Sequence, residues 1–195
     1  MLRHTFSNLA QRLRGLPPIT PGELSSGLLT QLIGKDNPLI IEIGANDGTH
    51  TAWFKKLFPR STIHCFEPDP RATARFVIKT AGLGGVHLHQ HVISDRMGEI
   101  DFYPSAQQVG GEDTNSWDCS GSIRRPTLHL EVHPHIQFGD PVKVRTFTLD
   151  EWCHQETISK IDFIWMDVQG AELDVFAGAS ETLRRVNFLY TEYSV

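Results

Sequence analysis

Short apolar runs alternate with segments of helical spacing along most of the chain. The runs at Leu39–Ile43, 61–66 and Ile161–Met166 are rich in apolar residues and too short for helices. Such runs are typical of strands buried on both faces of a parallel sheet, and we expect a last strand at 187–193. Because strands and helical segments alternate, the pattern predicts a three-layer α/β fold around a mostly parallel sheet.

Helix start signals follow several of these strands. Apolar side chains recur at helical spacing from near Thr49 onward. Asp69 suits an N-cap and Pro70 the first helical position, so a second helix should run to about Thr80. Another helix is expected near Leu149, with Asp150 as a cap whose carboxylate meets the helix dipole. These helices should cover the faces of the sheet.

A long polar segment, residues 104–140, interrupts this pattern. It lies between two short expected strands, 99–103 and Val142–Phe147, which we predict to pair with each other. Inserts of this length are usually functional or disordered. Its mixture of aromatic, basic and hydroxyl side chains, Ser122 among them, makes 104–140 a candidate cover for a substrate.

Two groups of histidines invite a metal interpretation. The first group alternates along an expected strand, but a polar face is also what an edge strand shows, and no carboxylate lies nearby. The second group lies in the insert, where Pro134 argues against a regular scaffold. We therefore predict no metal site. The histidines are His87, His89 and His91 in the expected strand 86–94, and His129, His133 and His135 in the insert.

The chain length suits one domain, preceded by a short N-terminal segment. Residues 1–22 contain arginines and no acid, which is compatible with a transit peptide, but their apolar spacing favours a plain amphipathic helix. Prolines then form a linker at 16–22. We expect the core domain at 23–195, with 104–140 as its insert.

Composition narrows the class of partner. The net charge of −5 and the lack of a basic stripe argue against nucleic acid or an acidic membrane as partner. No apolar stretch is long enough to span a membrane. Three cysteines without C-x-x-C spacing suit a reducing compartment, so a cytoplasmic location is the expectation. The partner should be a small molecule, and the oligomeric state stays open.

A glycine-bounded turn after Leu39–Ile43 is the main candidate for a ligand site. Gly44 and Gly48 would let the backbone approach a ligand, and Asn46 tolerates a left-handed conformation well. The free N–H groups of the following helix would face the ligand. Glu67, at the end of the second strand, stands where an acceptor for two ribose hydroxyls belongs.

The chemistry of the turn discriminates between cofactors. A dinucleotide needs G-x-G-x-x-G, and here the middle glycine is replaced by Asn46. S-adenosylmethionine has no phosphate and carries cationic groups, so Glu42 and Asp47 are better tolerated beside it. An ordinary glycine turn is the plain alternative. Ser94 and Asp95 close a later strand, where they could bind an adenine amino group or form an Asx turn.

With these features in place, the chain resembles the FkbM family of S-adenosylmethionine-dependent methyltransferases. The resemblance runs in order through residues 39–193. Its carriers are 41–48 (IEIGANDG), 66–68 (FEP), 93–95 (ISD), 121–122 (GS), 148–151 (TLDE) and 166–172 (MDVQGAE).

The resemblance implies a Rossmann-like methyltransferase fold, O-methylation of a sugar or other hydroxyl, and S-adenosyl-L-methionine as cofactor. It places Gly44, Asn46 and Gly48 in the cofactor loop, Glu67 at the ribose, and Ser94 with Asp95 near the adenine. The acceptor is then a small molecule or a glycan.

Methyl transfer to a hydroxyl needs alignment of donor and acceptor and removal of a proton. Asp167 is our candidate for the base because it should lie at the carboxyl end of a strand beside the donor methyl. Its alternative role is to stabilise the turn. Glu172 and Glu192 could orient the substrate or support the turn, and Ser122 is a further candidate for a substrate contact.

Two other functions stay open, and one feature departs from the family. Methyltransferases of this class usually end with an antiparallel strand pair, which is not expected before Val195. A nicotinamide-dependent oxidoreductase is a second enzyme hypothesis, although G-x-G-x-x-G is missing. A third hypothesis is a catalytically inactive binding module that recognises a glycan or protein through 104–140.

Overall fold

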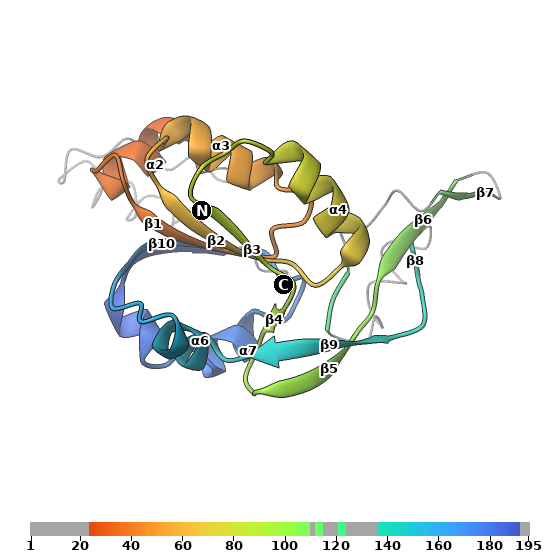
Figure 1. The fold of residues 1–195 in the computed structure, drawn as a ribbon. Coiled ribbons are helices and arrows are strands. Elements are labelled where there is room, and N and C mark those ends of the chain that lie inside the picture. Colours follow the sequence, from red (N-terminus) through yellow and green to blue (C-terminus); the bar gives the residue numbers. More distant parts are fainter. Residues whose placement is uncertain (1–23, 110–111, 115–120, 124–135, 192–195) are drawn as a thin grey trace, which may run out of the picture.

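We describe the fold from a computed structural model, which describes residues 24–109, 112–114, 121–123 and 136–191. Its centre is a five-stranded parallel sheet in the order β11-β10-β1-β2-β3 (Figure 1). The parallel order confirms the mostly parallel sheet predicted from the apolar runs. The strands are β1 (Leu39–Ile43), β2 (Thr62–Phe66), β3 (Val86–His89), β10 (Ile161–Met166) and β11 (Val186–Thr191).

The two central strands are buried as their composition predicts. Every residue of β10 is buried, and β1 is buried from Ile40 to Ile43. The register pairs Ile43 with Met166 and with Phe66, so β1, β10 and β2 end at the same level of the sheet. The carboxyl ends of three adjacent strands therefore meet at one edge.

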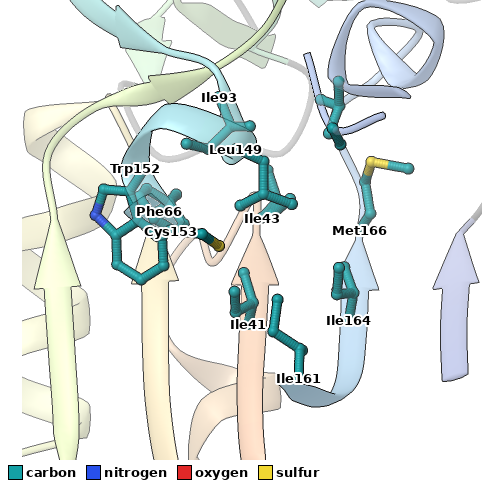
Figure 2. Packing of buried hydrophobic residues seen from close by; sticks show 12 residues of the cluster. Ile41, Ile43, Phe66, Ile93, Leu149, Trp152, Cys153, Ile161, Ile164 and Met166 are labelled. Carbon is teal, nitrogen blue, oxygen red and sulfur yellow. The ribbon is translucent and has the colours of Figure 1, made fainter. Parts of the chain in front are cut away.

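Helices cover both faces of this sheet and make the three layers (Figure 1). One face packs a core that includes Phe54, Phe76 and Phe163, beneath the first group of helices. The other face packs Ile164 and Trp152 beneath the second group (Figure 2). The first group is α2 (Ser26–Ile33), α3 (Thr49–Leu57) and α4 (Pro70–Lys79), and the second is α6 (Leu149–Gln155), α7 (Glu172–Ala177) and the 3₁₀ helix η1 (Thr182–Arg185).

The helix capping prediction is confirmed at α4 and corrected at α6. Asp69 caps α4, accepting the N–H of Arg71, and Pro70 is its first residue. At α6 the cap is Thr148, whose hydroxyl accepts the N–H of Glu151. Asp150 does lie in the first turn of α6, but its carboxylate accepts the N–H groups of residues 181 and 182 at 3.1 and 2.6 Å. It therefore ties η1 to α6 instead of capping its own helix.

The prediction of one continuous strand at 86–94 is wrong. The chain leaves the central sheet after His89 and resumes as β4 (Val92–Ile93), which pairs with β9 (Val142–Phe147) in a second sheet. Val92 and Ile93 are buried there, so packing on β9 outweighs continued pairing with β2. His91 falls in the break and does not share a strand face with the other histidines.

The second sheet extends from the main sheet toward the insert (Figure 1). Its order is β4-β9-β5, and β5 pairs with β9 in antiparallel fashion, as predicted for the strands that flank the insert. A third, three-stranded sheet follows in the order β7-β6-β8. The bounds are β5 (Gly98–Phe102), β6 (Ser105–Val109), β7 (Glu112–Thr114), β8 (Ile136–Phe138) and β9 (Val142–Phe147).

Some expectations fall outside the described residues. These are the N-terminal helix and linker at 1–22, Glu192, and the insert histidines at 129, 133 and 135. Within the described part of the chain, no helix has the length and apolar character needed to cross a membrane.

Candidate active site

A cavity of about 640 Å³, its open mouth included, lies at the carboxyl ends of β1, β2 and β10. Ligands of open α/β sheets bind at this edge. The inner wall comes from the ends of these strands, and the outer wall comes from β5 and the insert. The lining residues are Ile43, Gly44, Asn46, Phe66, Glu67, Pro68, His91, Val92, Ile93, Phe102, Gly121, Ser122, Ile123, Asp167, Val168, Gln169 and Ala171.

The turn after β1 has the backbone that its glycines predict. Gly44, Asn46 and Gly48 all have positive φ, at 86°, 45° and 80°. A Cβ on Gly44 would stand 1.9 Å from the carbonyl oxygen of Asp167. A side chain is therefore excluded there, because the backbones of two loops touch. Gly48 lies further along, where a Cβ would meet the Phe76 ring at 2.9 Å.

Glu67 joins the turn after β1 to the turn after β2. One carboxylate oxygen accepts the N–H of Asn46 at 2.9 Å and the other accepts the N–H of Asp69 at 2.8 Å. The side chain is 7% exposed and lines the cavity. Glu67 therefore holds the two turns together and places a carboxylate in the wall of the cavity.

Glu42 lies beneath the turn instead of in the cavity lining. Its carboxyl is fully buried, and one oxygen accepts the Thr51 hydroxyl and the Cys65 thiol. Burial raises the pKa of Glu42 to about 8, and the hydrogen bonds from Thr51 and Cys65 offset only part of that effect. Within the described residues, its other oxygen has no hydrogen-bond partner. At neutral pH this side chain is mostly an uncharged acid, which supports the loop from below.

Asp47 also stays outside the cavity lining. Its carboxylate forms an ion pair with Lys79 of α4 and accepts the N–H of Thr49 at 3.0 Å. Partial burial raises the pKa of Asp47, but hydrogen bonds from Lys79 and Thr49 outweigh it and leave the pKa below its usual value. Its observed partners hold the turn against α3 and α4.

Ser94 and Asp95 follow β4 but are not part of the lining. Ser94 is fully buried, and its hydroxyl donates to Asp95 at 3.3 Å. Asp95 pairs with Arg96 at 3.0 Å. Their neighbours Val92 and Ile93 do line the cavity. The predicted contact with adenine remains a prediction.

Asp167 lines the cavity at the end of β10, where the sequence predicts it. Its N–H donates to the carbonyl of Ile43 at 2.9 Å, which continues the pairing of β10 with β1. One carboxylate oxygen accepts the amide of Gln169 at 2.6 Å. Ser122 lines the same cavity, and its hydroxyl donates to the carbonyl of Gln169 at 3.0 Å.

Glu172 is the first residue of α7 and is not part of the lining. Its carboxylate accepts the N–H of Gly170 at 3.2 Å. This contact supports the turn that follows Asp167. A role in substrate binding stays a prediction, as it does for Glu192.

The histidines of β2 and β3 form a stacked group on the α6 side of the sheet. His64 stacks on His87 and His89 with ring centres 4.9 and 5.3 Å apart, and Trp152 packs against two of these rings. Burial lowers the pKa of His64 to about 4, with a further contribution from its neighbouring imidazoles. In the described ranges, no group of three or more His, Cys, Asp or Glu residues could hold a metal ion. His64 is therefore neutral at physiological pH.

Several residues that line the cavity were not predicted from the sequence, and three of them show why. His91 lines it from the break between β3 and β4, and Phe102 and Gln169 from β5 and the turn after β10. Only Gln169 had a usable signal, because it lies within the segment 166–172 that also contains Asp167. The other two reach the site because β4 pairs with β9 and brings the second sheet to the cavity, which local patterns do not reveal.

Comparisons with known proteins agree with this architecture. The family model of the methyltransferase FkbM domain matches residues 42–195. The 2-O-methyltransferase NoeI of Sinorhizobium fredii is 44% identical over 191 residues, which cover 96% of this chain and 77% of that protein.

More distant relatives are also methyltransferases by name. Methyltransferase 1 of Beauveria bassiana is 26% identical and spans 75% of this chain and 60% of its own length. The hexuronic acid methyltransferase AglP of Haloferax volcanii is 23% identical and spans 81% of this chain and 56% of its own. The chain thus covers less than two thirds of these two relatives.

Proposed function

The chain belongs to the FkbM methyltransferase family, and from this premise we propose that it transfers the methyl group of S-adenosyl-L-methionine to a hydroxyl of a sugar. The observation that carries the proposal is the shared cavity of Glu67 and Asp167. These two carboxylates come from the ends of β2 and β10, on either side of the glycine turn after β1.

The cavity suits this methyl donor in shape and charge. At Gly44 a Cβ would collide with the backbone of Asp167, so a glycine is required there, and Gly44 lines the cavity without a side chain. A position without a side chain lets an adenosyl group approach the strand ends closely. The Asp167 carboxylate complements a ligand that carries a sulfonium, whereas it would repel a pyrophosphate. This contrast disfavours a nicotinamide cofactor.

We assign Glu67 to the ribose of the donor. Its oxygens already accept N–H groups of residues 46 and 69, which fixes the carboxylate in orientation. An oriented acceptor can take the two ribose hydroxyls with little loss of side-chain entropy. Val92 and Ile93 then give the adenine an apolar surface, with Ser94 and Asp95 as its predicted polar neighbours.

We assign Asp167 to the acceptor hydroxyl. When bound, the donor supplies an activated methyl group that leaves its sulfur as the attacking oxygen bonds to it. The chain's own task is to hold that oxygen in line and to accept its proton. The carboxylate of Asp167 lines the same cavity as Glu67, so it can receive this proton while the donor is bound.

The acceptor class follows from the relatives and from the outer wall. One relative is named a 2-O-methyltransferase, and another is named a hexuronic acid methyltransferase. Among the described residues, the outer wall combines Phe102, the Ser122 hydroxyl and Ile123. A sugar presents apolar C–H faces and hydroxyls, which match such a surface. We therefore propose a glycan or a small sugar-containing molecule as acceptor. The cysteine pattern favours a cytoplasmic location for the reaction.

Incubation of the protein with methyl-labelled S-adenosylmethionine and a panel of glycans and small metabolites tests the proposal. We expect label on a sugar hydroxyl, and loss of about 100-fold or more in rate for Asp167→Asn. Calorimetric titration separates the alternatives. Binding of S-adenosylmethionine without binding of NAD supports the methyltransferase, binding of NAD alone supports an oxidoreductase, and binding of neither supports a binding module. Unchanged methylation by Asp167→Asn contradicts the role of Asp167 as base.

A further inference from the structure

Gln169 is held in an unusual backbone conformation directly beside the candidate base. Its φ of 52° is in the left-handed region, which a residue with a long side chain rarely adopts. This conformation lets the side-chain amide donate to Asp167, two residues earlier, at 2.6 Å. Such strain persists only where the surroundings impose it.

Part of this constraint is the turn itself, in which the N–H of Ala171 donates to the carbonyl of Val168 at 3.3 Å, and the insert adds a further contact. The Ser122 hydroxyl donates to the main-chain carbonyl of Gln169 at 3.0 Å, and Ser122 is 7% exposed. Ser122 is itself fixed by two backbone hydrogen bonds with Tyr103, at 2.9 and 3.2 Å. An unbroken series of contacts therefore runs from β5 through Ser122 and Gln169 to Asp167.

We propose that Gln169 is a positioning residue, which orients the Asp167 carboxylate toward the acceptor and is itself set in place by Ser122. The proposal deepens the proposed function and rests on Asp167 as the base. It makes the outer wall, which contacts the acceptor, part of the mechanism that aligns the proton acceptor.

The amide of Gln169 has a second effect on Asp167. A donor at hydrogen-bond distance favours the charged carboxylate, so the amide stabilises the form of Asp167 that can accept a proton. A glutamate at position 169 has the same shape but places a second negative charge beside Asp167. Like charges this close disfavour ionisation of one another.

A carbon-13 NMR titration of the aspartate carboxyl carbons tests this without an identified acceptor. The signal of Asp167 is assigned as the one missing from Asp167→Asn. We expect Gln169→Glu to raise its titration midpoint by about one pH unit, and Gln169→Ala by about half as much. Ser122→Ala should change the midpoint in the same direction by less, because it releases only the main chain of Gln169.

The chain offers a matched control for the charge change. On α6, Gln155 donates its amide to Glu151 at 2.8 Å, as Gln169 does to Asp167. Gln155→Glu introduces the same change away from the cavity and should leave the Asp167 midpoint within about 0.2 units, since exposed charges are screened over about 10 Å. Circular dichroism shows whether each variant is folded. If Gln169→Glu does not fold, Gln169→Asn replaces it in the titration.

The outcomes separate this inference from the function on which it rests. A midpoint unchanged in both Gln169→Glu and Gln169→Ala overturns the role of Gln169, whether or not the enzyme methylates sugars. A shifted midpoint supports it. In the methyl-transfer assay, full activity of Asp167→Asn would show that Asp167 is not the base, and Gln169 would then have no base to position. The proposed binding of the donor is tested separately and would not be affected by this result.

Discussion

The inner and outer walls of the cavity are built on different principles. The inner wall is held together by hydrogen bonds between backbones. The N–H groups of Gly44 and Ala45 donate to the carbonyl of Phe66 at 2.9 and 3.0 Å, and the N–H of Asp167 donates to the carbonyl of Ile43. The outer wall rests on the isolated bridge between residues 103 and 122 and on side-chain contacts. We propose that the inner wall binds the methyl donor and the outer wall binds the acceptor.

The difference predicts how each wall tolerates an added methyl group. Gly44→Ala should lower the free energy of unfolding by more than about 5 kcal/mol, since its Cβ meets a carbonyl oxygen that cannot move away. Gly82→Ala is the control, because Gly82 has a similar φ of 80° but open space around it. It should cost only about 1 kcal/mol. Urea denaturation measures both, and equal losses would refute the close packing of the two loops.

Glu42, which lies beneath the inner wall, should make the free energy of unfolding depend on pH. Glu42 has a folded-state pKa of about 8, above its unfolded value near 4.5. The folded state therefore holds the proton more tightly, and its stability is full below pH 4.5 and falls as pH rises to about 8. The span is roughly 3 to 5 kcal/mol.

Glu42→Gln should remove this fall, so its free energy of unfolding changes far less between pH 5 and pH 9. The exposed Glu99→Gln is the control and should retain the wild-type decline. Denaturant unfolding at several pH values measures the slope. A decline in Glu42→Gln equal to that of the wild type would mean that another group causes it.

An added methyl group in the outer wall should cost less than one at Gly44. At Gly121 a Cβ would stand 2.6 Å from the tip of the Phe102 ring, a side chain that can shift. Gly121→Ala should cost about 1 to 3 kcal/mol and weaken acceptor binding more than donor binding. Denaturation and calorimetry with S-adenosylmethionine measure the two effects. A large loss of donor affinity would show that the outer wall also binds the donor, against the division of donor and acceptor binding between the two walls.

The smallest effect is expected where the two walls are joined. Arg71 pairs with Asp69 at 2.6 Å and also donates to the carbonyl of Ser105, at the start of β6, at 2.9 Å. Arg71→Ala should change stability by less than about 1 kcal/mol but speed amide exchange in β6 about 5-fold. Arg60→Ala removes the exposed ion pair with Asp36 and should leave β6 unchanged. Equal exchange in both variants would contradict the link.

What could be predicted from the sequence follows the same division. The glycine turn, the buried strands and the cap at Asp69 depend on residues close in the chain, and the structure has them as expected. Ser94 and Asp95 were expected at the ligand because they end a strand, yet that strand belongs to the second sheet.

Features decided by distant contacts could not be predicted. The carboxylate of Asp150 bonds to residues 181 and 182, more than 30 positions away. Glu42 is buried by α3 and β2, so its charge state depends on packing that no local pattern records. Ser122 reaches Gln169 across 47 positions. The candidate site was therefore predictable in its inner wall, and only in outline beyond it.

The position of the donor ribose tests the central claim most directly. A crystal structure of the protein with S-adenosylhomocysteine, the product form of the donor, shows where the nucleoside lies. We predict both ribose hydroxyls within hydrogen-bond distance of the Glu67 carboxylate, with the sulfur facing Asp167 across the turn at Gly44. A ribose bound away from Glu67, or a cavity that stays empty at saturating ligand, would contradict the proposed site.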